Sequence, residues 1–151
     1  MFMKDTGELD KKLLNTAPDK IGEYLKENDK YLAGGDKSFY YYFKDIVDAK
    51  NMRLKDIYTA AGVSESYGSK IVTMEKHTKN RDLIIKLCVV AHFALGEINT
   101  ALKLYGFNAL YSKNRKDACI IVAINNRIFE LTKINEMLAQ QGLEGLCEKG
   151  D

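Results

Sequence analysis

The chain has 151 residues, of which 46% are hydrophobic and 29% are charged, so it is long enough to bury one ordinary globular core. The formal net charge of +2 is too small to identify a partner. With a single proline and no tryptophan, most stretches repeat apolar residues three and four apart, which is typical of amphipathic helices. The sequence therefore predicts an all-α fold.

Cysteine usage and the terminal segment bear on the cellular compartment. Cys88, Cys119 and Cys147 form no C-x-x-C pair, which argues against a disulfide framework or a zinc site. The first ten residues contain acids and no apolar segment, unlike a secretory signal, and the longest apolar run, near residues 83–95, is too short to span a bilayer. We expect reduced thiols, a cytoplasmic location, and neither a metal nor a cofactor.

Two short helices are expected at the N-terminus. Leu9, Leu13 and Leu14 share one face of a helix over residues 6–15. Pro18 then suits the first turn of a second helix. A glycine pair follows, so we expect residues 1–37 to form a helical extension of the main body.

A longer helix is expected to begin near Ser38 with the sequence FYYYF. A core-facing stripe at helical spacing is formed by Phe39, Tyr42, Phe43, Ile46 and Val47. Tyr40 and Tyr41 fall outside this stripe. They could stack on a nucleic-acid base or a partner, or be partly covered by the N-terminal helices.

Residues 54–72 predict two helices joined by a tight turn. Ile57 faces inward on the first helix and Ile71 on the second. Gly62 permits the positive backbone angle that the turn needs, and Val63 fills the junction. The pattern therefore favours a helix-turn-helix.

The stretch MRLKDIYTAAGVSESYGSKI resembles the helix-turn-helix of the phage-repressor and Cro type, in which Gly-Val-Ser leads into the DNA-reading helix. The resemblance covers about residues 38–92 and implies a lambda-repressor-like bundle. Two positions differ from the family pattern: Tyr58 replaces a small residue, and Gly68 replaces a branched aliphatic one. Because these positions normally touch, we expect the tyrosine ring to fill the volume that the glycine leaves.

The same resemblance implies that the second helix enters the major groove of DNA. The side chains expected to meet base edges are Ser64, Glu65, Ser66, Ser69 and Lys70. Lysine can donate to guanine and glutamate can accept from cytosine. Contacts to backbone phosphates are expected from Lys55, Lys76, Lys79 and Arg81. A solvated basic face is the alternative interpretation of these four cations.

Residues 95–111 recur at an offset of 36 as residues 131–147. The positions that recur are Leu95, Ile98, Asn99, Leu102, Gly106 and Leu110, matched by Leu131, Ile134, Asn135, Leu138, Gly142 and Leu146. Upstream, Arg81-Asp82 is echoed by Lys116-Asp117. Each unit is predicted to be a helical hairpin whose second helix ends at a glycine and an apolar latch. Chance similarity between amphipathic helices is the alternative.

The LGEIN and LTKIN hairpins, together with the basic loop over residues 76–82, resemble a narrower set of bacterial regulators without an assigned target. We expect a helix-turn-helix core over residues 38–111 and a C-terminal hairpin over residues 112–151 packed on it. His77 and His92 have no spaced acid or cysteine partner, so the sequence does not favour an enzyme.

These patterns predict a transcriptional regulator that binds double-stranded DNA in a sequence-specific manner. A homodimer is expected, because one reading helix covers only a half-site. The alternative is a protein-interaction module that kept the repressor-like shape and lost DNA binding. Glu65, Gly68, the low surplus of positive charge and the added hairpins favour that alternative.

Overall fold

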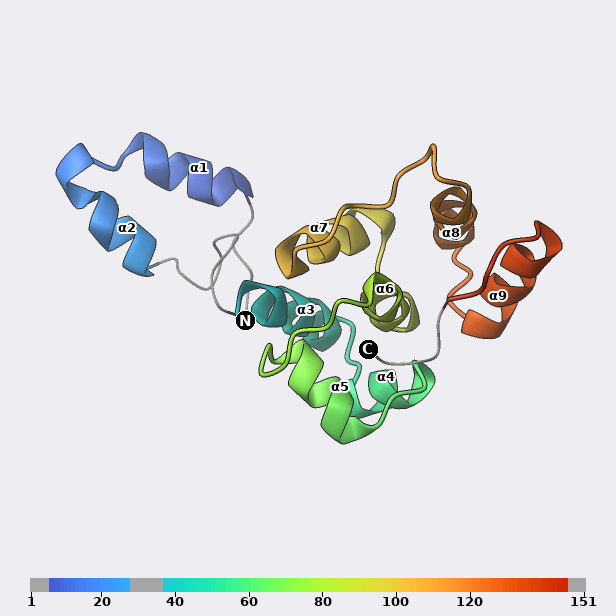
Figure 1. Cartoon of the computed structure of the whole chain (residues 1–151). Coiled ribbons are helices and arrows are strands. Elements are labelled where there is room, and N and C mark those ends of the chain that lie inside the picture. The colour runs from blue at the N-terminus through green and yellow to red at the C-terminus, as the bar shows by residue number, and fades with distance from the viewer. Residues whose placement is uncertain (1–5, 28–36, 147–151) are drawn as a thin grey trace.

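The computed structural model (Figure 1) describes residues 6–27 and 37–146, with side chains from residue 10 onward in the first range. Every regular element in these ranges is helical, as predicted. The elements in chain order are α1 (Thr6–Leu14), the 3₁₀ turn η1 (Pro18–Lys20), α2 (Ile21–Glu27), α3 (Ser38–Ala49), α4 (Leu54–Ala60), α5 (Glu65–Val72), α6 (Arg81–Val90), α7 (Leu95–Tyr105), α8 (Arg115–Asn125) and α9 (Leu131–Gln140). The side chain of Leu9, the glycine pair Gly34-Gly35 and Cys147 lie outside the described residues.

The N-terminal helices α1 and α2 form a pair that projects from the rest of the molecule (Figure 1). Pro18 begins a 3₁₀ turn that leads directly into α2, whereas the sequence placed it in the first turn of the second helix itself. Tyr24 is buried, but Leu13, Leu14, Ile21 and Leu25 are exposed to solvent. This pair therefore leaves most of its large apolar side chains without cover.

Helix α3 brings the aromatic part of the core. Phe39 and Phe43 are fully buried, which confirms the predicted stripe. The ring centroid of Phe39 lies 4.9 Å from that of Tyr105 in an edge-on contact, and that of Phe43 lies 5.2 Å from Phe93. Aromatic pairs at such separations add stabilisation beyond the area they bury. These contacts hold α3 against α7 and against the segment that joins α6 to α7.

The two tyrosines outside this stripe, Tyr40 and Tyr41, are half-buried. Their rings lie 5.4 Å apart, and Tyr40 packs against the core. The core therefore covers part of Tyr40, and the expected cover by the N-terminal helices stays a prediction.

Helix α6 lies at the centre of the main body (Figure 1). Every residue from Leu83 to Val90 is buried, including Lys86. Helices α4, α7 and α9 all pack against it. A helix that is apolar on all sides is typical of such a central position.

Among the described residues, no helix is both long enough and apolar enough to cross a membrane.

Helices α6 and α7 with the segment through Leu110 form hairpin 1, and helices α8 and α9 through Leu146 form hairpin 2. The amide oxygen of Asn99 accepts a hydrogen bond from the backbone N–H of Leu110 (3.0 Å). At the matching positions, the amide oxygen of Asn135 accepts one from Leu146 (2.8 Å). The predicted repeat is confirmed, because both hairpins fasten their final segment with the same side chain.

The helix ends of the two hairpins match as well. Asn80 caps α6 and Asn114 caps α8, each by accepting a hydrogen bond from a backbone N–H three residues later. Gly106 (φ 104°) ends α7 and Gly142 (φ 70°) follows α9, so both glycines occupy the left-handed conformation that side chains disfavour. The matching N-caps and the matching C-terminal glycines therefore both support the internal repeat.

Candidate nucleic-acid interface

A short turn joins α4 to α5. Gly62 has a φ of 77°, and the N–H of Val63 donates to the carbonyl of Tyr58 (3.0 Å) to close the end of α4. The hydroxyl of Ser64 then accepts from the N–H of Tyr67 (3.1 Å) and caps α5. These local interactions produce the predicted helix, turn and helix.

Tyr58 and Gly68 make the close contact between α4 and α5. A Cβ atom added to Gly68 would lie 2.6 Å from Cδ1 of Tyr58 and 2.7 Å from its Cγ, closer than atoms can approach. The ring is 3% exposed, and burial raises the pKa of Tyr58 to about 12. The expected exchange of a large and a small residue is therefore present, and it lets the helices approach closely.

The outward face of α5 carries the side chains that were expected to read bases. Glu65, Ser66 and Lys70 are exposed, and Ser69 is half-buried. Ser64 is exposed but uses its hydroxyl as the cap. A shallow hollow in front of these residues reaches the Tyr58 ring, with Leu54 and Lys55 on its far side. The surface is polar and accessible, and the buried Tyr58 forms part of the floor of the hollow.

The loop after α5 is held in place by α7. The N–H of Thr78 donates to the hydroxyl of Tyr105 (2.9 Å), and the His77 ring stacks on the Tyr105 ring at 4.5 Å. Within this loop, Nζ of Lys76 lies 5.1 Å from the ring centroid of Tyr67, a cation–π contact. Lys76 is therefore positioned beside α5, and Lys79 is exposed nearby in the sequence.

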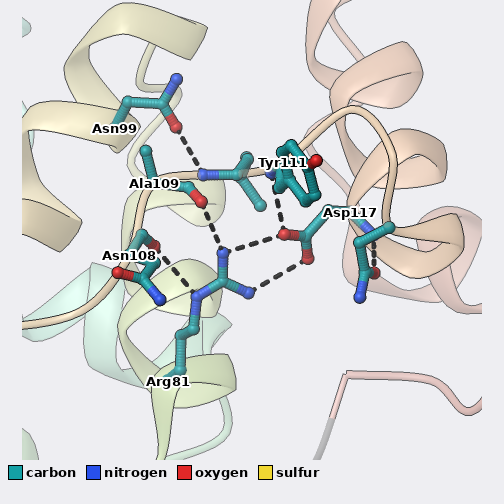
Figure 2. A network of polar contacts seen from close by, with 8 residues as sticks. Arg81, Asn99, Asn108, Ala109, Tyr111 and Asp117 are labelled. Atoms are coloured by element: carbon teal, nitrogen blue, oxygen red, sulfur yellow. Dashed lines mark hydrogen bonds and ion pairs between the residues drawn. The ribbon is translucent and has the colours of Figure 1, made fainter.

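Arg81 has a different environment from the one predicted, since all three of its guanidinium nitrogens donate to groups within the protein (Figure 2). Nη1 and Nη2 bind the two carboxylate oxygens of Asp117 at 3.0 and 2.9 Å. Nε donates to the carbonyl of Asn108 and Nη2 to that of Ala109, each at 3.1 Å. These bonds occupy the group that phosphate would need, so we remove Arg81 from the predicted DNA contacts.

A second ion pair crosses in the opposite direction between the hairpins. Nζ of Lys116 lies 2.8 Å from a carboxylate oxygen of Asp82 and 3.2 Å from the carbonyl of Gly145. Gly145 matches Ala109 at the 36-residue offset, so the cation of each basic–acidic dipeptide binds the final segment of its own hairpin and the acid of the other hairpin. Sequence reasoning noticed the repeated basic–acidic dipeptide but missed this crossed pairing.

The charges near α5 are mixed. Lys55, Lys70 and Lys79 are exposed, but so are the acids Glu65 and Glu75. A fourth lysine, Lys76, is exposed as well. Without Arg81 the positive surplus of this face is small, so binding of a polyanion would be weaker than at a strongly basic surface.

No group of three side chains that could hold a metal ion occurs within the parts of the chain that the structure describes. A comparison with protein-family models, with characterised proteins and with solved structures finds no match. The functional proposal therefore depends on the geometry of α4, α5 and the following loop.

Proposed function

We propose that this protein binds double-stranded DNA with α5 and acts as a transcriptional regulator. The observation that carries the proposal is the combination of a capped, outward-facing α5 with a close packed contact behind it. Ser66 and Lys70 are exposed on α5, while Gly68 on the other side is sealed by Tyr58. Such a helix can enter the major groove with its polar face forward.

The chemistry of α5 suggests what it would read. Lys70 can donate to the O6 and N7 of guanine, and Glu65 can accept from the amino group of cytosine. Glu65 also repels the phosphate backbone. Opposite a base with no amino group to donate to it, the Glu65 carboxylate would have no partner, so a wrong base would be disfavoured. Phosphate contacts would come from Lys55, Lys76 and Lys79, which surround α5. A few cations for each chain favour binding as a homodimer.

A selection from random duplexes at low salt tests this proposal, with the double variant Lys70→Glu/Lys79→Glu run in parallel. We expect the wild type to enrich one sequence and the variant to enrich none. Lys113→Glu is the matched control, because Lys113 is exposed and precedes α8. Enrichment by the double variant equal to that of the wild type would contradict the proposed interface.

The second candidate is a protein-binding surface at the same site. Two observations favour this alternative. A hollow on this face is lined by Tyr58 and Glu65, and the Arg81 guanidinium binds Asp117 within the protein. A stoichiometric protein partner that is released by Glu65→Lys, together with a duplex selection that enriches nothing, would decide for it.

A further inference from the structure

Hairpin 2 has an open apolar groove between α8 and α9. The groove encloses about 540 Å³. Its apolar lining consists of Ala118, Cys119, Val122, Met137 and Leu143, and its polar lining of Arg115, Gln140 and Gln141. Val122 is 52% exposed and the other four apolar side chains are half-buried, so they form a contiguous exposed apolar patch rather than a single exposed residue. In repeated architectures the last unit normally presents a polar outer face, so this groove is an exception that calls for an occupant.

The internal repeat shows what kind of occupant fits. Met137 and Gln141 match Ala101 and Tyr105 of hairpin 1 at the 36-residue offset. Ala101 is fully buried and Tyr105 is 2% exposed. In hairpin 1 this surface receives α3, whose Phe39 packs on Tyr105. The α9 side of the groove is therefore the counterpart of the α7 surface on which α3 packs in hairpin 1.

Phe39 and Phe43 show the spacing that such a helix uses. They lie four residues apart, on one face of α3, and both are buried. In α2, Ile21 and Leu25 have the same spacing, but they are 45% and 48% exposed. Helix α2 thus presents two aliphatic side chains with the geometry that fills the equivalent surface in hairpin 1.

The exposed apolar side chains concentrate on these two surfaces. Among the described residues, six large apolar side chains are exposed. Four belong to the N-terminal pair (Leu13, Leu14, Ile21 and Leu25) and a fifth, Val122, lies in the groove. Docking α2 in the groove would cover Ile21, Leu25 and Val122, and removing these apolar side chains from water favours association.

The two surfaces belong to opposite ends of the molecule, with α3 and α6 between them (Figure 1). The nine residues that link α2 to Lys37 can span at most about 30 Å. We propose that α1 and α2 of one copy dock in the α8–α9 groove of a second copy, and that the exchange is reciprocal. A two-fold dimer results, and its formation is independent of DNA binding.

Sedimentation equilibrium of the full chain measures the dimer directly. We expect Val122→Asp in the groove and Leu25→Asp in α2 each to raise the dimer dissociation constant at least about tenfold, because each places a charge in an apolar interface. Asn125→Asp is the matched control, since Asn125 is exposed on α8 outside the groove lining, and it should leave the constant unchanged. A wild-type monomer, or a dimer that both variants leave intact, would overturn the proposal.

A disulfide identifies the occupant. Cys119 lines the groove, and Cys88 is fully buried. In a Cys147→Ser background, the thiol introduced by Leu25→Cys should, under mild oxidation, form a disulfide with Cys119 of a second chain. The product is a covalent dimer, visible by non-reducing electrophoresis and peptide mass. The same background without Leu25→Cys should stay uncrosslinked. A bridge within one chain, or none, would overturn the exchange.

Discussion

Replacing Arg81 with alanine should destabilise the protein, because Arg81 is the main partner of a buried carboxylate. Asp117 has only 8% of its side chain exposed, and its carboxylate is held by both Nη atoms of Arg81 and by the N–H of Tyr111 (3.0 Å). Arg81→Ala would leave this buried charge with one partner, and breaking a buried ion pair on one side costs about 3 kcal/mol or more. For a chain of this length that corresponds to a fall in melting temperature of roughly 6–12 °C.

Urea and thermal denaturation measure the effect. Arg81→Lys keeps the charge but loses the two-pronged contact and a carbonyl bond, so we expect it to cost about 1–2 kcal/mol. Lys44→Ala serves as the control, because the Lys44–Asp48 pair is exposed and such pairs contribute about 0–1 kcal/mol.

A double-mutant cycle isolates the interaction itself. Asp117→Ala combined with Arg81→Ala should cost less than the sum of the single changes, since the double variant leaves no unpaired charge between α6 and α8. If Arg81→Ala kept wild-type stability and reduced only DNA affinity, the structural role of Arg81 would be refuted.

Three further predictions concern packing, alkaline pH and the repeat. Gly68→Ala should destabilise the protein by about 1–3 kcal/mol despite alanine's better helix propensity, because its Cβ would lie 2.6 Å from the Tyr58 ring. Adding Tyr58→Ala should remove this clash. An unchanged urea midpoint for Gly68→Ala would contradict the predicted clash. Because burial raises the pKa of Tyr58 to about 12, the unfolded state loses this proton first, so stability should fall between about pH 10 and 12; Tyr58→Phe should flatten that decline. Asn135→Ala should cost about 1–2 kcal/mol in urea denaturation, because the N–H of Leu146 loses its 2.8 Å bond.

Local patterns were the part of the fold that the sequence predicted best. Gly62 and Ser64 determine a turn through their own backbone and hydroxyl chemistry, so the helix, turn and helix could be anticipated. The contact between Tyr58 and Gly68 was also predictable, because two opposite departures from a family pattern compensate each other. The repeated hairpins followed from apolar positions that recur at one offset.

Contacts between residues far apart in the sequence were harder to predict. Arg81 lies in a basic stretch and reads as a phosphate contact, yet its partner Asp117 is 36 residues away. Only the packing of hairpin 2 on hairpin 1 brings them together. The exposure of Leu14 and Leu25 could not be predicted either, because periodicity identifies the apolar face of a helix but not the element that covers it.

The most direct test of the central claim is the salt dependence of binding to a duplex recovered by selection. With Lys55, Lys70, Lys76 and Lys79 contacting phosphates or bases and Arg81 held internally, about three phosphates are neutralised by each chain. The logarithm of the binding constant should then fall against the logarithm of salt with a slope near −3 for one chain and about −5 to −6 for a dimer. Lys79→Glu should make the slope shallower by about one for each half-site, whereas Lys113→Glu should leave it unchanged. A protein that retains no duplex at low salt, or whose slope is unaffected by Lys79→Glu, would contradict DNA binding through this surface.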